Sequence, residues 1–196
     1  MPTSAVIAEN VWWICVVAWF LLRLPYQLRS WKEPIRLSRR DWIDWAVLTF
    51  MVGCNGVIPF IYVVTKFPRF ANYPFVPAFA FIGTAVFLAA LWLFYRTHRD
   101  LGRNWSMSLE IRRDHRLVTT GVYRWIRHPM YLAFLLWGLA QTLLLPNWIA
   151  GPAGLVGSTT LFLFRVWREE RLMLQEFGEQ YSGYMQRTAR LVPWMF

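Results

Sequence analysis

The chain has 196 residues, of which 57% are hydrophobic, 18% are aromatic and only 16% carry a charge, and its formal net charge is +10. Soluble globular domains carry about 25% charged residues. This composition argues against a soluble domain. It predicts an integral membrane protein, because long stretches without a single charge need lipid as their solvent.

The apolar stretches predict an all-α protein with about five transmembrane helices, because roughly 20 apolar residues in a helix cross a bilayer. The first stretch is preceded by Glu9, which we expect near the interface. The second and third contain Pro59 and Pro77, which helices in lipid tolerate. Pro146 and Asn147 separate the last two, which predicts a tight helical hairpin. The stretches are residues 11–22, 45–65, 73–95, 130–145 and 148–164.

The basic residues are sorted by these five spans. Of the 21 Lys and Arg, six lie between the first two spans, eight between the third and fourth, and five after the fifth, so 19 fall on one side. The positive-inside rule makes that side cytoplasmic and places the N-terminus outside. Topology therefore accounts for the net charge, and no nucleic-acid partner is expected. Residues 1–10 lack the basic region of a cleaved signal peptide, so the first helix is expected to remain.

The chain is expected to form a single membrane domain with two parts. Residues 1–95 hold the first three helices, and residues 96–196 hold the hairpin with the polar segments 96–129 and 165–196. Both polar segments attach to the same end of the hairpin and face the cytoplasm, so they can fold over it and form a pocket partly in water and partly in lipid. The fifth helix is expected to continue beyond the membrane to Gly178, a residue type that commonly ends helices.

Neither a disulfide framework nor a metal site is expected. The two cysteines, Cys15 and Cys54, lie in apolar spans and are interpreted as small buried hydrophobic residues. His98, His115 and His128 lack the regular spacing and the carboxylate or cysteine neighbours that a metal site needs.

The densest group of reactive residue types is LVTTGVYRWIRHPMY, residues 117–131. Gly121 permits a turn that other residues avoid, and His128 precedes Pro129, which suits the first turn of a helix. A helix N-terminus attracts anions, so a cofactor carboxylate could bind there. The alternative is that His128 caps the helix at the interface while the neighbouring arginines contact lipid headgroups.

Two further groups follow in the C-terminal segment. Arg165 and Glu169 are four residues apart on one helical face, and Glu170 points elsewhere. They could form an exposed ion pair that stabilises by only about 0.3–0.5 kcal/mol. A buried guanidinium could instead hold a carboxylate bidentately. Tyr181 and Tyr184 could pack against an adenine or a sulfonium, or could belong to an interfacial aromatic belt.

The motifs LGRNWS, HRLVTTGVYRWIRHPMY and RVWREERLMLQEFGEQYSGYMQRTARLVP occur in this order over residues 101–193. Together they resemble the isoprenylcysteine carboxyl methyltransferase family, including its small prokaryotic members, and more distantly the phospholipid N-methyltransferases. The resemblance implies an enzyme that uses S-adenosyl-L-methionine (SAM), releases S-adenosyl-L-homocysteine (SAH), and methylates a lipophilic substrate, such as a prenylated cysteine, that enters from the bilayer.

The resemblance also implies roles for individual residues. Arg165, with Glu169, would organise the substrate end and form the catalytic pair. Where many relatives carry a proline between the arginine and the two glutamates, this chain has Trp167, which affects the expected local helix bend. The residues implied to bind the cofactor are Leu117, Val118, Gly121, Tyr123, His128, Tyr131, Glu169, Glu170 and Tyr181.

Alternative functions remain open at this point. A carboxylate acceptor is ionised at neutral pH and needs no base, whereas a lipid amine or small thiol would need Glu169 or His128 as one. Sterol reductases, which bind NADPH, also share an Arg-His-Pro element but are usually much longer. An ion transporter would place ionisable residues within the spans, which here hold none apart from Glu9 at one end. A membrane scaffold is the remaining alternative.

Overall fold

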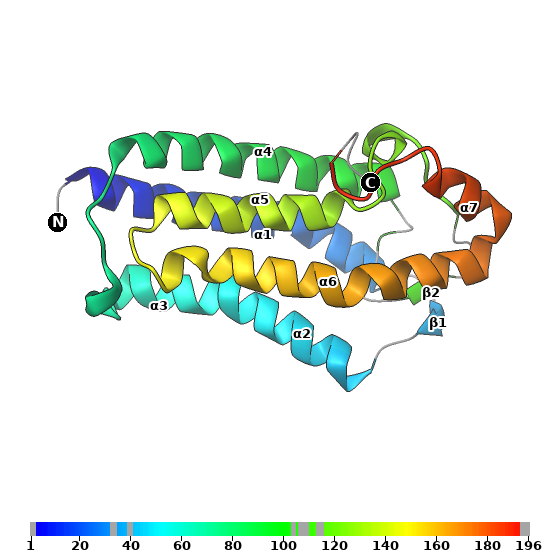
Figure 1. Ribbon diagram of the computed structural model, residues 1–196, viewed down its shortest axis with the longest axis horizontal. Helices are drawn as coiled ribbons and strands as arrows, with labels where there is room; N and C mark the ends of the chain where they lie inside the picture. The colour runs from blue at the N-terminus through cyan, green and yellow to red at the C-terminus, as the bar shows by residue number, and fades with distance from the viewer. Residues whose placement is uncertain are drawn as a thin grey trace.

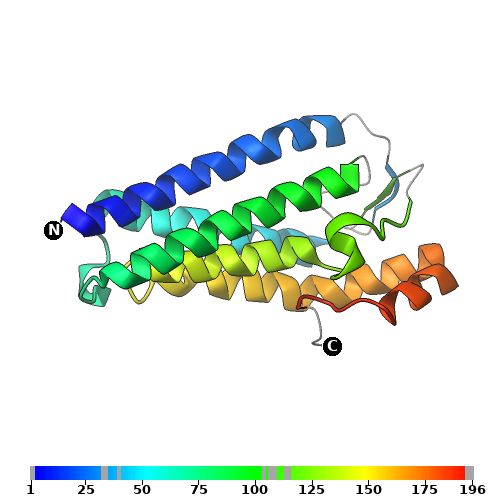
Figure 2. The ribbon, with the colours of Figure 1, turned by 90° about the horizontal axis from the view of Figure 1, so that it is seen from above.

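The computed structural model describes residues 3–31, 35–38, 41–102, 105, 110–112 and 116–192. Long helices lie side by side and form an elongated bundle (Figures 1 and 2). The elements of its columns, in chain order, are α1 (Thr3–Ser30), α2 (Trp42–Val52) continued by the π-helix η1 (Gly53–Val57) and α3 (Ile58–Thr65), then α4 (Pro77–Leu101), α5 (Pro129–Leu144) and α6 (Ala150–Phe177).

Each of the five predicted spans overlaps one column. Three columns are long and apolar enough to cross a bilayer, namely Ser4–Ser30, Trp42–Thr65 and Pro77–Leu101. Helix α5 is a shorter apolar helix, and α6 is apolar until Arg165 and charged beyond it. The all-α integral membrane fold is therefore confirmed, and the crossing of the bilayer by α5 and α6 stays a prediction.

The two prolines sit at helix beginnings. The predicted third span began at Tyr73, but α4 begins at Pro77, which occupies its first turn and cannot kink it. The missing N–H of a proline is no loss in that turn. Pro59 lies in the first turn of α3, directly after η1, so this column changes its winding there. The expectation of prolines inside the spans was wrong for Pro77.

The α5–α6 hairpin is confirmed, and small residues allow its close packing. A Cβ on Gly138 of α5 would lie 2.4 Å from the backbone nitrogen of Leu155 on α6. Small residues also allow α6 to approach η1, since a Cβ on Gly157 would lie 2.5 Å from the Cβ of Cys54. Such contacts are typical of membrane helices, which gain little from the hydrophobic effect and associate through close van der Waals packing.

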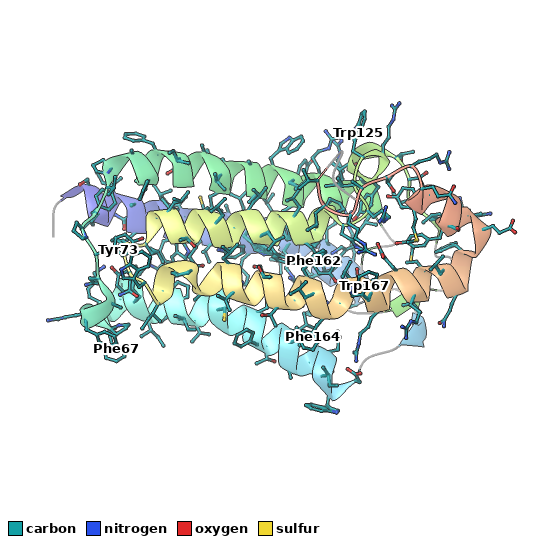
Figure 3. The ribbon with its side chains drawn as sticks, in the orientation of Figure 1. Phe67, Tyr73, Trp125, Phe162, Phe164 and Trp167 are labelled. Atoms are coloured by element: carbon teal, nitrogen blue, oxygen red, sulfur yellow. The ribbon has the colours of Figure 1, made fainter. Side chains whose placement is uncertain are left out.

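Asn147 fixes the turn of the hairpin. Its side-chain nitrogen donates to Pro68 O at 2.9 Å and Asn72 Oδ1 at 2.8 Å, around the short helix η2 (Arg69–Ala71). Its side-chain oxygen accepts from the Ala150 backbone at 2.9 Å, in the first turn of α6. Phe67 and Tyr73 mark this end of the bundle in Figure 3. At the same end Glu9, which is buried, pairs with Lys66.

The opposite end carries the shorter elements. Strands β1 (Ile35–Ser38) and β2 (Glu110–Arg112) pair antiparallel, an element that the sequence did not predict. The 3-10 helix η4 (Gly121–Arg124) and α7 (Glu179–Met185) also lie there (Figure 1). Helix α6 ends at Gly178, whose φ of +51° confirms the predicted stop. The two polar segments therefore do meet over one end of the hairpin.

Candidate active site

A cavity of about 650 Å³ runs from this end into the bundle between α1, α2, α4, α5 and α6. Its outer half is polar, and its inner half is apolar. The outer half includes Arg116, Arg127, His128, Arg165, Glu169 and Tyr181. The inner half includes Val16, Trp19, Leu48, Met51, Phe134 and Leu161. Such a cavity can hold a polar group and an apolar chain at the same time.

Glu169 brings three elements together at the outer half of the cavity. The hydroxyl of Tyr131, on α5, donates to Glu169 Oε1 at 2.5 Å. Nδ1 of His128, the residue before α5, lies 3.5 Å from Glu169 Oε2. The Glu169 side chain is 31% exposed and lines the cavity, so a ligand can reach it.

Glu170, the next residue, is enclosed by basic groups. Its Oε1 accepts from Arg127 Nε at 3.1 Å, and its Oε2 accepts from Arg190 Nη2 at 2.9 Å. His128 Nε2 lies 3.3 Å from Oε1, and only 4% of the Glu170 side chain is exposed. We call these four residues the Glu170 cluster. It ties the C-terminal segment to α5 and α6.

The charges around His128 shift the pKa of each partner. Burial disfavours the charged imidazole, but hydrogen bonds and charge from Glu169 and Glu170 outweigh it and raise the pKa of His128 above 6.5. Burial would raise the pKa of Glu170, but hydrogen bonds from His128 and Arg190 lower it to about 2. The pKa of Glu169 is likewise lowered against its burial, by His128 and Arg165. Both acids are therefore carboxylates at neutral pH.

Arg165 is held by Asp44, a residue that sequence reasoning missed. Arg165 Nε lies 3.0 Å from Asp44 Oδ1, and the two side chains are 7% and 1% exposed. Asp44 lies in the first turn of α2, where Asp41 caps the helix by accepting from the Asp44 backbone at 2.8 Å. The one sequence signal for this pair was an acidic residue at the start of one apolar span and the first arginine after another.

His98 is a second residue that sequence reasoning did not assign to the cavity. It is fully buried on α4, and it lines the cavity next to Trp105. Its Nδ1 lies 2.9 Å from Phe94 O, an acceptor, so Nδ1 carries the proton and Nε2 is left as an acceptor. Among the described residues Nε2 has no hydrogen-bond partner. His115 lies outside the described residues.

Gly121 shapes the wall behind the cavity. Its φ is +64°, and a Cβ there would lie 2.0 Å from Asp100 Oδ2. That oxygen accepts from the Val122 backbone at 2.9 Å, so the turn docks onto the end of α4. Tyr184 of α7 supports the same turn, since its hydroxyl donates to Tyr123 O at 2.6 Å.

Trp167 occupies the position where a proline was expected by analogy. The guanidinium of Arg190 lies 3.9 Å from the centroid of its ring, a cation–π contact. Trp167 and Trp125 both lie at the cavity end of the molecule in Figure 3. Trp167 thus covers one side of the Glu170 cluster, and α6 continues through it without a break.

The structure brings most of the predicted site residues to one cavity. Gly121 and Glu170 do not appear among the described residues that line it, and both act behind its wall. The predicted residues that line it are Leu117, Val118, Tyr123, His128, Tyr131, Arg165, Glu169 and Tyr181.

Comparison with known proteins finds similar sequences over about half of the chain. The model of the isoprenylcysteine carboxyl methyltransferase family matches residues 81–175. Protein-S-isoprenylcysteine O-methyltransferase B of Arabidopsis thaliana is 40% identical over 96 residues, which cover 48% of this chain and 49% of that protein. The Tribolium castaneum protein-S-isoprenylcysteine O-methyltransferase is 38% identical over 82 residues, which cover 42% of this chain and 29% of that protein.

A solved structure agrees with these sequence matches. The eukaryotic intramembrane Ras methyltransferase ICMT aligns with a TM-score of 0.56 and 29% identity over 76% of this chain and 52% of that one. The chain spans half or less of the length of the two curated relatives. The matched segment carries the cavity residues on α4, α5 and α6, and over this segment the chain is similar to the isoprenylcysteine carboxyl methyltransferase family.

Proposed function

We propose that this protein transfers a methyl group from SAM to the carboxylate of a prenylated cysteine or a similar lipophilic acid. The observation that carries the proposal is the single cavity whose polar half contains Arg165 and Glu169 and whose apolar half continues into the bundle. Pockets that bind small molecules and cofactors have volumes of about 300–1,000 Å³, and this one falls within that range.

The residues of the outer half fit the polar parts of SAM. When bound, SAM would supply a methyl group from a positively charged sulfonium, and the electron pair of the broken sulfur–methyl bond would stay on sulfur as SAH forms. The accessible carboxylate of Glu169 suits a cationic ligand, and the rings of Tyr123 and Tyr181 can pack against one. Leu117 and Val118 would bound the adenine side, and His128 and Tyr131 would hold Glu169 in place.

Arg165 is the residue that we assign to the acceptor carboxylate. A guanidinium binds a carboxylate bidentately and leaves a lone pair free for attack on the methyl carbon. Asp44 contacts Arg165 through Nε, the inner nitrogen, and so orients the plane of the guanidinium. Positioning of the two reactants is the main contribution that such a site makes to the rate.

The pKa directions favour a carboxylate over an amine or thiol acceptor. An amine or thiol must lose a proton, and the available bases are Glu169 and His128. Burial would raise the pKa of Glu169, but His128 and Arg165 lower it, so Glu169 is a weak base. The pKa of His128 is raised despite its burial, so the imidazole is more often protonated. A carboxylate acceptor needs neither residue as a base.

The rim of the cavity suggests how a lipid-like acceptor enters. Phe20 on α1 and Trp45 and Val52 on α2 line the cavity, yet they are 63%, 47% and 59% exposed. In a bilayer these side chains face acyl chains, so the gap between α1 and α2 is a lateral entrance. The 19 basic residues predicted on one side support a cytoplasmic active site and C-terminus with the N-terminus outside.

Calorimetric titration of the detergent-purified protein with SAH tests the cofactor, with NADPH as the control. We expect saturable SAH binding and no NADPH binding. Binding of NADPH alone would favour a reductase, and binding of neither compound would favour a scaffold. Turnover of a prenylated cysteine with radiolabelled SAM then tests the acceptor, with a phospholipid amine as the competing substrate.

A further inference from the structure

The cavity ends inside the bundle on each of the five columns. The innermost described residues that line it are Val16 on α1, Gly56 in η1, Phe94 on α4, Trp137 on α5 and Leu161 on α6. Further along four of these columns lie Trp12, Phe87, Gln141 and Ser158, which do not line the cavity and are each no more than 1% exposed. A chain that enters from the polar half therefore meets a floor near the middle of the bundle.

Gly56 leaves open space at this floor. A Cβ built on Gly56 meets nothing within 4 Å, and its φ is not positive, so the backbone accepts an ordinary side chain. The turn around it is firmly held. The Asn55 side chain donates to Met51 O at 3.1 Å and Ser158 Oγ at 3.3 Å, and Gln141 Nε2 donates to Cys54 O at 3.2 Å.

The depth of the apolar half can be read from helix geometry. From Met130 to Trp137 the cavity follows α5 for seven residues, about 10 Å at 1.5 Å per residue. From Trp45 to Gly56 it follows α2 and η1 for eleven residues, about 16 Å. A fully extended chain advances about 1.1–1.2 Å per bond, so roughly 9 to 14 bonds fit. The cavity is therefore deepest along α2 and η1, where it ends at Gly56.

We propose that Gly56 sets the length of the lipid tail that the cavity accepts. The inference rests on the proposed function, since it concerns the tail of the same acceptor. Because Gly56 has no side chain, the end of the tail can occupy the space beside it. The hydrogen bonds of Asn55 hold η1 in place, so the site does not lengthen for a longer tail. An isoprenoid of farnesyl length suits this depth.

The test is the length preference of Gly56→Leu, measured as kcat/KM for S-geranyl, S-farnesyl and S-geranylgeranyl derivatives of N-acetylcysteine. One methylene in an apolar site changes discrimination by about 10-fold or more. We expect the ratio of kcat/KM for the S-farnesyl derivative to kcat/KM for the S-geranyl derivative to fall at least about 10-fold in Gly56→Leu. In Gly56→Ala the same ratio should fall by less. SAH titration of each variant checks that the fold is kept.

Gly53→Leu is the matched control. Gly53 lies in the same π-helix and also has nothing within 4 Å of a built Cβ, but it is not among the described residues that line the cavity. We expect its length preference to equal that of the wild type. An unchanged ratio in both Gly56 variants, with turnover and SAH binding retained, would overturn the inference alone. A wild-type protein that turns over none of the three derivatives would overturn the proposed function, and the inference with it.

Discussion

Glu169 and Glu170 are neighbours in the chain, but the fold uses them differently. The Glu169 side chain is 31% exposed and faces the cavity, with Tyr131 and His128 on its other sides. The Glu170 side chain is 4% exposed and accepts from Arg127 and Arg190. The face of α6 that carries Glu169 is thus available to ligands, and the face that carries Glu170 binds the C-terminal segment. Two identical side chains therefore have separable roles.

The largest expected effect belongs to Arg165, on the cavity face. Arg165→Ala removes the group that we assign to the acceptor carboxylate, so methyl transfer should be abolished while SAH affinity stays within a few-fold of the wild type. Turnover with radiolabelled SAM and SAH titration measure the two quantities. Full turnover on every accepted substrate would show that Arg165 does not hold the acceptor. Asp44→Asn should lower kcat less, because the guanidinium remains but loses its charged partner.

Glu170→Gln should cause a large loss of stability. It leaves Arg127, His128 and Arg190 without their shared carboxylate, and breaking a buried charge pair costs about 3–5 kcal/mol. Thermal unfolding in detergent should show a clear decrease in melting temperature. If Glu170→Gln instead kept the wild-type melting temperature and lost only SAH affinity, Glu170 would be a ligand contact rather than a brace.

Glu169→Gln should have the opposite signature. A hydrogen bond to a charged group contributes about 1.5–3 kcal/mol, so SAH should bind roughly 10- to 100-fold more weakly. Stability should change less than in Glu170→Gln, because the Glu169 side chain is 31% exposed and that of Glu170 only 4%. Titration and thermal unfolding of the two variants side by side test the comparison. Equal losses of stability would remove the distinction between the two faces.

The pH dependence of stability offers a finer test of the Glu170 cluster. The pKa of Glu170 is lowered from 4.5 to about 2, so its contribution is present above pH 4.5 and lost as pH falls through about 2. The pKa of His128 is raised above 6.5, so its contribution is present below pH 6.5 and lost as pH rises through the folded value. Melting temperature should decline on both sides. His128→Gln should flatten the alkaline side and also reduce the acid-side decline, because His128 helps to lower the pKa of Glu170.

Sequence reasoning reached the features that local patterns encode. Charge-free stretches gave the columns, Pro146 and Asn147 marked the hairpin, and Gly178 ended α6 as expected. Motifs shared with the family led to eight residues that do line one cavity. These features depend on composition or on residues close together in the chain, which a single sequence displays directly.

The remaining features depend on packing between distant segments. Asp44 and Arg165 are 121 positions apart, and no local pattern pairs them. Adjacent residues on a helix point about 100° apart, but only the packing of α5 and the C-terminal segment decides that Glu169, not Glu170, meets the cavity. The π-helix around Gly56 likewise follows from contacts with Gln141 and Ser158 on other helices.

The smallest expected effect lies on the outward face of α6. Arg168 Nη1 donates to Asp41 Oδ2 at 2.9 Å, but the two side chains are 38% and 41% exposed, and water screens such pairs. Arg168→Ala should therefore leave melting temperature, SAH affinity and turnover at wild-type values within error. Asp41→Ala should lower the melting temperature, because it also removes the cap that accepts from the Asp44 backbone. A loss of turnover in Arg168→Ala would show that the functional face of α6 includes Arg168 as well as Arg165 and Glu169.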